Sequence, residues 1–145
     1  MFYSYPQVTL NYVADVNKPD VKLASQTDAE RFCTTLYGEG VVSLYECAFA
    51  IYVNRANDVI GVMPLGSGGR AGVIMDIALI AQAALLANAH GVILTHNHPS
   101  GQQHPSAADR RVTADVKAAL KLFSIELLDH IIVTANGAKA FGHEQ

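Results

Sequence analysis

Two histidines and one aspartate give this sequence its strongest chemical signal. His96 and His98 stand two residues apart at the end of a short apolar run, and Asp109 follows at the start of the next amphipathic segment. Alternate residues of an extended chain point to the same side, so both imidazoles can converge on one ion. Two nitrogens and one carboxylate oxygen form the ligand set typical of catalytic zinc, whose fourth position is left for water.

Ser106 and Asp109 also fit a pattern that needs no metal. Ser-x-x-Asp resembles a capping box, with Asp in place of the usual Glu or Gln, in which each side chain bonds the other residue's backbone N–H. A histidine pair alone is a weak signal. The metal interpretation gains from the combination of two histidines at a strand end, a Pro/Gly-rich loop and an acid at the next helix start. Both interpretations remain open at this level.

The elements that must position these residues follow from hydrophobic periodicity and turn signals. A buried strand over 91–95 leads into a polar loop over 96–105, and an amphipathic helix over 107–123 follows. The remaining predictions are a strand over 8–13, a helix capped by Thr27 or Asp28 and ending near 36, strands over 44–53 and 59–64, a fully buried helix over 72–89, and strands over 126–133 and near 140–141. This order predicts an α/β sandwich, with one mixed sheet and helices packed against it.

Composition narrows the class of protein. Half of the 145 residues are hydrophobic and only 16% are charged, which excludes a disordered chain or a coiled coil. The net charge of −3 disfavours nucleic acid as the main partner, although Arg110 and Arg111 form a local basic pair. Cys33 and Cys47 are too few for a disulfide scaffold. No apolar stretch is clean enough for a membrane span and no signal peptide is visible, so we expect a soluble, cytoplasmic protein.

The spacing of the metal-binding candidates resembles the JAMM signature of JAB/MPN metalloproteases. That signature is His-x-His, seven residues, Ser, two residues and Asp, and His98, Ser106 and Asp109 keep its spacing. The stretch HNHPSG over 96–101, with Leu-Asp-His over 128–130, is similar to the RadC-like branch. The resemblance covers roughly 42–142 and implies one RadC-like domain over 1–145, of the JAB/MPN (cytidine-deaminase-like) α/β type, without the helix-hairpin-helix region of longer members.

The family also uses a glutamate on an upstream strand. The match here is Glu46, because Glu39 lies in a Gly-flanked loop that is a poor place to hold a base rigidly. The resemblance implies one Zn²⁺ per chain, held by the two histidines and Asp109. Glu46 would then act as general base in the hydrolysis of a peptide or isopeptide bond.

Three further residues receive roles from the resemblance. Ser106 would donate a hydrogen bond to the developing oxyanion, in competition with its capping role. His130 is expected behind the ligands or in the core. Asp129 is a candidate acceptor that orients a ligand imidazole.

The implied substrate is a protein or peptide, with a ubiquitin-like modifier as one candidate. The aromatic N-terminal segment, with Phe2, Tyr3, Tyr5 and Tyr12, would pack on an edge strand or mediate a homodimer. Two alternatives are a DNA-repair-associated accessory protein and a non-catalytic protein-binding module. A zinc nucleobase deaminase is excluded because H-x-E and P-C-x-x-C are both missing.

Overall fold

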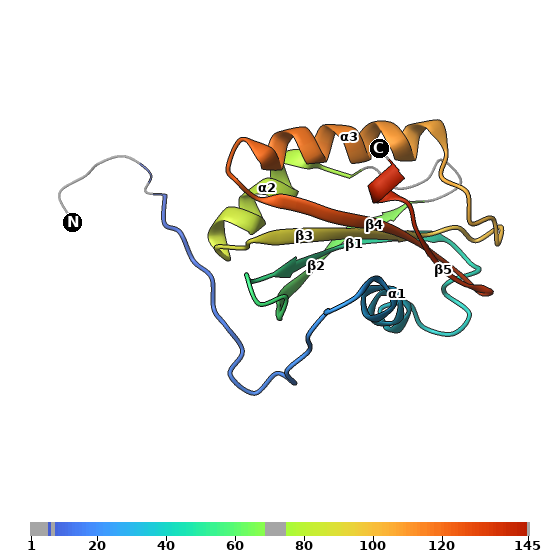
Figure 1. The fold of residues 1–145 in the computed structure, drawn as a ribbon, viewed down its shortest axis with the longest axis horizontal. Coiled ribbons are helices and arrows are strands. Elements are labelled where there is room, and N and C mark those ends of the chain that lie inside the picture. Colours follow the sequence, from blue (N-terminus) through green and yellow to red (C-terminus); the bar gives the residue numbers. More distant parts are fainter. Residues whose placement is uncertain (1–5, 7, 69–74, 145) are drawn as a thin grey trace.

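A five-stranded mixed sheet with helices on both faces forms the body of the computed structural model (Figure 1). The structure describes residue 6, residues 8–68 and residues 75–144. The strand order is β2-β1-β3-β4-β5; β3 and β4 run parallel, whereas the other neighbouring pairs are antiparallel. The elements are α1 (Gln26–Thr35), β1 (Glu46–Val53), β2 (Val59–Gly68), α2 (Ile77–Leu86), β3 (Gly91–Asn97), α3 (Ala107–Lys121), β4 (Glu126–Thr134), β5 (Gly137–Ala140) and a final 3₁₀ turn, Gly142–Glu144. The predicted fold class is confirmed.

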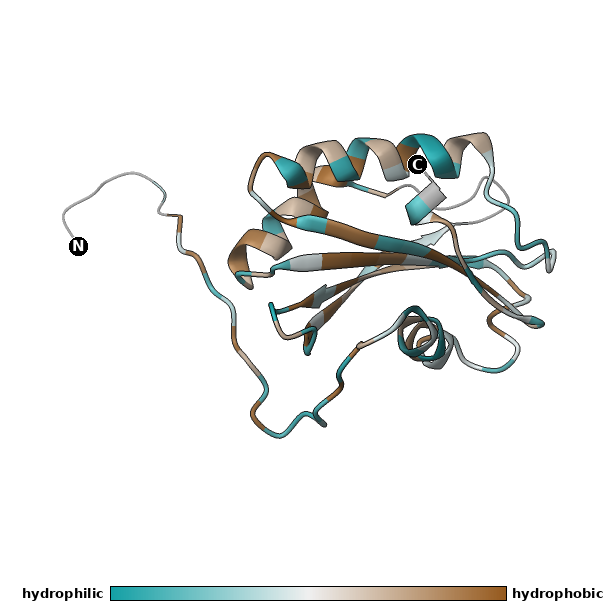
Figure 2. Ribbon diagram, viewed as in Figure 1, coloured by the Kyte–Doolittle hydropathy of each residue, from teal (hydrophilic) through white to brown (hydrophobic). Residues whose placement is uncertain are grey.

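Alternation along the strands sends side chains into two apolar cores, one under each helical layer. On one face, Ile51 and Ile93 pack with α1; on the other, Ala50 and Leu94 pack with α2 and α3. Figure 2 shows the central strands as largely hydrophobic. Because successive strand residues face opposite sides, His96 shares the α2 and α3 side with Leu94. The sheet therefore aims this histidine at α3.

The strand that carries His96 is longer than the sequence predicts. The apolar run ends at Thr95, but β3 continues through Asn97, and His96 and Asn97 are both buried. The expected polar loop therefore starts at His98. Hydrogen bonds made by the two polar side chains allow the strand to continue past the end of the apolar pattern.

Two helices begin away from their predicted positions. Helix α1 is capped by Ser25, whose hydroxyl accepts the N–H of Asp28, so the predicted caps Thr27 and Asp28 are wrong by two or three residues. Helix α2 is capped by Asp76 and begins at Ile77; residues 72–74 of the predicted helix lie outside the described residues. Its expected full burial is also wrong, because Ile80 and Ala84 face the sheet while Leu79, Leu85 and Leu86 are exposed.

The predicted strand over 8–13 is wrong. These residues form extended, exposed chain that runs away from the body of the protein (Figure 1). Val8 and Leu10 are 92% and 83% exposed, which shows that alternating hydrophobicity makes a strand only where a partner strand pairs with it. The Tyr12 hydroxyl donates to the carbonyl of Ile60 on the edge strand β2. The other aromatic residues of this segment lie outside the described part of the chain.

No helix in the described part of the chain combines the length and the apolar character needed to cross a membrane.

Candidate metal centre

The C-terminal end of β3 carries both candidate histidine ligands. His96 is on the strand and 2% exposed, and His98 follows just beyond it. The backbone N–H of His98 bonds to Val133 of β4, and a tight turn follows in which Gly101 donates to the His98 carbonyl. Pro99 suits the second position of such a turn, and Gly101 adopts its φ of 84° without strain. The turn folds the loop back across His98.

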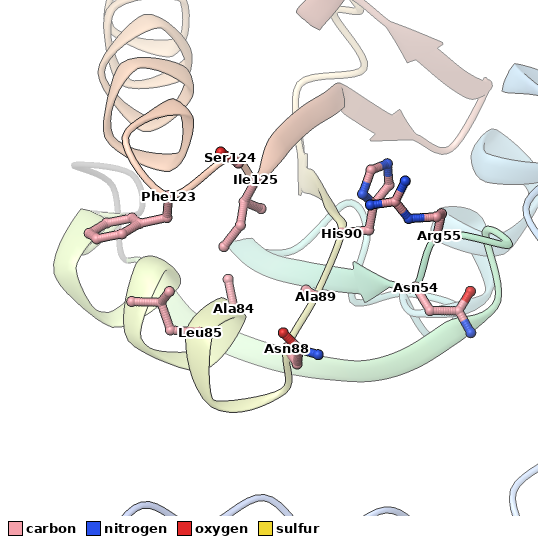
Figure 3. Close-up of a pocket in the computed structure, with 10 residues that line it drawn as sticks. All are labelled: Asn54, Arg55, Ala84, Leu85, Asn88, Ala89, His90, Phe123, Ser124 and Ile125. Atoms are coloured by element: carbon pink, nitrogen blue, oxygen red, sulfur yellow. The ribbon is translucent and has the colours of Figure 1, made fainter.

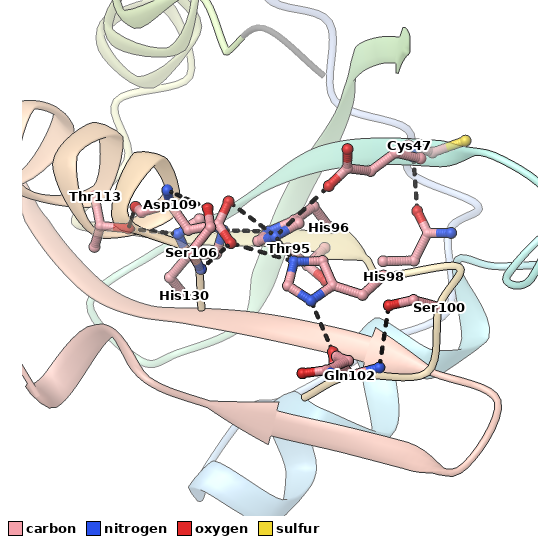
Figure 4. A network of polar contacts seen from close by, with 12 residues as sticks. Cys47, Thr95, His96, His98, Ser100, Gln102, Ser106, Asp109, Thr113 and His130 are labelled. Atoms are coloured by element: carbon pink, nitrogen blue, oxygen red, sulfur yellow. Dashed lines mark hydrogen bonds and ion pairs between the residues drawn. The ribbon is translucent and has the colours of Figure 1, made fainter. Parts of the chain in front are cut away.

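Asp109 enters the same space from the first turn of α3. The Ser106 hydroxyl accepts the N–H of Asp109 at 3.0 Å, and the Asp109 carboxylate accepts the N–H of Ser106 at 2.8 Å. This is the reciprocal capping box that the sequence suggested. The cap fixes the carboxylate so that one oxygen faces each histidine (Figure 4). Capping and metal binding are therefore compatible roles for the same aspartate.

The distances among these side chains match a tetrahedral metal site. The two Nε2 atoms lie 2.9 Å apart, and Asp109 oxygens lie 3.3 Å from His96 Nε2 and 3.2 Å from His98 Nε2. Ligand atoms 2.0–2.1 Å from a tetrahedral zinc ion are separated by about 3.3 Å. The three groups are thus already gathered at close to the required separation.

A chain of hydrogen bonds decides which ring nitrogen of His96 carries the proton. The Thr113 hydroxyl donates to the Asp109 carbonyl at 2.6 Å, so its oxygen accepts from His130 Nδ1 at 2.7 Å. His130 Nε2 is then an acceptor, and it takes the proton of His96 Nδ1 at 2.8 Å. In the neutral ring, His96 Nε2 therefore presents a lone pair to the site.

A backbone carbonyl in the neighbouring loop sets the tautomer of His98 in the same way. His98 Nδ1 lies 2.7 Å from the carbonyl of Gln102, which can only accept a hydrogen bond, so Nδ1 carries the proton. Its Nε2 also presents a lone pair. Metal-binding histidines usually donate their other ring N–H in this way, which fixes the tautomer and the ring orientation.

Two lone pairs and a carboxylate facing one another at about 3 Å are stable only with a cation between them, either a proton or a metal ion. Burial raises the pKa of the Asp109 carboxyl, but the hydrogen bonds that His96 and His98 make to it when protons, rather than a metal ion, occupy the site outweigh burial and hold that pKa well below its usual range. The hydrogen bond to Asp109 raises the pKa of His98 above 6.5. Complete burial lowers the pKa of His130 well below 6.5, which keeps this ring neutral. The donor set therefore fits a divalent cation.

Glu46 stands beside the histidines at the start of β1. Its Oε1 lies 4.0 Å from His96 Nε2, and Glu46, His96 and His98 offer ligand atoms within 4.8 Å of one another, so these three could hold a metal ion. The pairing of Ala48 with His96 across β1 and β3 places a small residue beside the imidazole. Asp109 approaches both Nε2 atoms more closely than Glu46 approaches His96, so its carboxylate is also a candidate for the third ligand.

The other predicted site residues have different surroundings. Ser106 is exposed at the cap of α3, where its oxygen accepts one N–H and its hydroxyl proton remains available. Asp129 does not orient a ligand imidazole: its Oδ1 accepts the backbone N–H groups of His130 and Gly142 and lies 3.8 Å from His143 Nδ1. The residue that lies within hydrogen-bond distance of His96 Nδ1 is the next one, His130, whose ring points to the opposite side of the strand.

Sequence reasoning missed Thr113 and Asn97. Thr113 is four residues after Asp109, on the same face of α3, and this spacing is the signal that could have indicated it. Asn97 is a fully buried polar residue at the end of β3, between the two histidines. Its partners lie in the segment that leads into β1 and at the start of that strand.

A cavity of about 390 Å³ lies at the other end of the sheet. Arg55 and His90 both line it (Figure 3). Asn88 and Ser124, which have positive φ angles and follow the ends of α2 and α3, line it as well. His90 precedes β3 whereas the metal centre follows it, so the cavity is separated from the centre by the length of that strand.

The mixed sheet flanked by helices is consistent with a JAB/MPN-type fold. The chain belongs to the RadC-like JAB domain family, whose model matches residues 23–145. It is 36% identical to a UPF0758 protein of Flavobacterium johnsoniae over 85% of this chain and 52% of the relative. It is 39% identical to a UPF0758 protein of Thiobacillus denitrificans over 67% of this chain and 43% of the relative. The chain thus spans about half the length, or less, of these curated relatives. The resemblance stated from the sequence is confirmed.

Proposed function

We propose that this domain is a zinc-dependent hydrolase of amide bonds in peptides or isopeptides. The observation that carries the proposal is the convergence of two Nε2 lone pairs and the Asp109 carboxylate at 2.9–3.3 Å, with a second carboxylate beside them. His96, His98 and Asp109 would hold one Zn²⁺ per chain. The three-ligand set favours a catalytic site over a closed structural one, since structural zinc sites use four protein ligands.

A zinc ion bound there supplies two effects: it lowers the pKa of a water molecule to about 7 and polarises a carbonyl oxygen. Glu46 does the proton transfer. Its Oε1 accepts the proton of the attacking water and delivers it to the leaving nitrogen, a general-base role that contributes roughly 10²–10⁴ in rate. The Ser106 hydroxyl donates to the oxyanion that forms on the carbonyl, while its oxygen continues to cap α3.

The substrate is a protein or peptide with an amide bond that can enter between Glu46 and the histidines. The side chains of Glu46, His98 and Asp109 are 20%, 15% and 17% exposed, so the centre is partly open to solvent. A ubiquitin-like modifier is one candidate.

Metal content and one pair of variants test this function. Protein purified without chelators should contain about one zinc per chain. Glu46→Gln should keep the zinc and lower the cleavage of peptide and isopeptide libraries by about 10²-fold or more. Glu39→Gln is the matched control, since Glu39 is an exposed residue in the turn before β1, and it should have wild-type activity. Full activity of Glu46→Gln would refute the general-base assignment, and zinc-free protein of normal stability would favour a non-catalytic protein-binding module.

A further inference from the structure

Asn97 lies between the two histidines in sequence but on the other side of the sheet. It is fully buried, and its side chain reaches the segment before β1 and the start of β1 itself, where Val42 and Cys47 pack against the core under α1. The metal centre lies on the α3 side. Asn97 therefore touches neither the candidate ligands nor a substrate bound to them.

Both N–H groups of the Asn97 amide donate hydrogen bonds to backbone carbonyls here, and its oxygen accepts one from a backbone N–H. Oδ1 accepts the backbone N–H of Cys47 at 2.6 Å, and Nδ2 donates to the carbonyls of Val42 and Tyr45 at 2.8 and 2.9 Å (Figure 4 shows the Cys47 contact). A flipped amide would place its oxygen against two carbonyls, so only one orientation is satisfied. One side chain thus fixes three backbone groups across a turn.

Two of these three anchors flank Glu46. Tyr45 precedes it and Cys47 follows it, so the hydrogen bonds hold the backbone on both sides of the glutamate. Glu46 is the first residue of β1, and strand ends open more easily than strand centres. We propose that Asn97 is a positioning residue that fixes the start of β1, and so keeps the Glu46 carboxylate beside the metal centre. This inference rests on the proposed function of Glu46.

The test detects the negative charge of the Glu46 carboxylate through its effect on the binding of an anion, so it needs no substrate. Co²⁺ is bound to the protein in place of zinc, and thiocyanate is titrated onto the open position while the visible spectrum is recorded. A carboxylate held nearby repels this anion, so Glu46→Gln should raise thiocyanate affinity about fivefold or more. Asn97→Ala releases the carboxylate and should raise the affinity about threefold or more. In the Glu46→Gln background, Asn97→Ala should change nothing further.

Asn54→Ala is the matched control. Asn54 also anchors backbone groups with its amide, because its Oδ1 accepts the N–H groups of Ala56 and Asp58 in the turn after β1. It lies at the far end of the same strand, so its loss should lower stability and leave thiocyanate affinity at the wild-type value. If Asn97→Ala does not fold, Asn97→Thr takes its place; Thr suits a strand, and its single hydroxyl cannot bridge the three groups.

The outcomes separate the two proposals. Failure of the wild type to bind one Co²⁺ per chain would overturn the metal centre itself. If Co²⁺ binds and Glu46→Gln raises thiocyanate affinity, but the Asn97 variants match Asn54→Ala, then Asn97 only stabilises the fold and the inference is wrong. If Glu46→Gln has no effect, Glu46 does not face the open position, and both its role and that of Asn97 are overturned.

Discussion

Removing one hydroxyl, with Thr113→Val, should weaken zinc binding at a centre that this residue does not touch. Thr113 accepts the proton of His130 Nδ1, and this bond makes His130 Nε2 the acceptor for His96. Valine has the same shape but no acceptor. His130 is then free to carry its proton on Nε2, which forces the proton of His96 onto the nitrogen that faces the metal.

The size of the effect follows from the two hydrogen bonds. Valine leaves no cavity, and the Asp109 carbonyl stays in the helix ladder, so the main loss is the buried partner of His130. That loss costs about 1–3 kcal/mol of stability. Loss of a group that orients a ligand imidazole typically lowers metal affinity 10–100-fold, and we expect Thr113→Val to lie in that range.

Chelator competition measures the zinc affinity, and urea unfolding of the metal-free protein measures stability. Thr113→Ser keeps the hydroxyl and should stay within about threefold of wild-type affinity. Thr34→Val is a control for the helix, because Thr34 makes the same bond to the carbonyl four residues earlier but on the exposed side of α1; it should change stability by less than about 0.5 kcal/mol. If Thr113→Val loses stability but keeps wild-type zinc affinity, the tautomer argument is refuted.

Two further predictions concern the metal-free protein. Because the pKa of His130 is lowered in the folded protein, stability should fall as pH drops below about 6.5, where the unfolded chain binds a proton at this residue and the folded chain does not. Because the pKa of His98 is raised in the folded protein, His98 contributes stability below about pH 6.5, and this contribution is lost as pH rises through the folded pKa. Urea unfolding across this range should therefore show a maximum near about pH 6.5. A steady rise through pH 8 would contradict the direction given for His98, and stability that does not fall below about pH 6.5 would contradict the direction given for His130. Gly142→Ala should cost about 1–3 kcal/mol, since its new methyl group would lie 2.5 Å from the backbone nitrogen of His130, whereas Gly61→Ala meets no atom within 4 Å and should be neutral or stabilising in thermal unfolding.

The sequence predicted the donor atoms better than it predicted their surroundings. The spacing of His96, His98 and Asp109 follows from strand alternation and from a helix cap, both of which are local. The position of His130 depends on β4 lying beside β3 in a particular register, where Leu94 pairs with His130. That register is set by packing between distant segments, so Thr113 and His130 could not be joined into one relay from the sequence alone.

The errors in the predicted elements have the same origin. An apolar pattern ended β3 at Thr95, but Asn97 extends it through contacts with residues about fifty positions earlier. The alternation over 8–13 predicted a strand, yet these residues pair with no other strand in the described chain. In both cases tertiary partners, which a local pattern does not contain, decided the outcome.

The topology explains why Glu46 needs an anchor of its own. The parallel strands β3 and β4, with α3 crossing between them, form one unit that supplies His96, Asp109, Thr113 and His130, so these residues are positioned together by a single packing arrangement. Glu46 comes from outside that unit, on an antiparallel strand that starts at the edge of the site. Its position depends on how the segment before β1 meets β3, and Asn97 is the buried side chain that makes this connection. Variants of the relay should therefore change metal affinity, whereas variants of Asn97 should change the position of the carboxylate and leave the ligands in place.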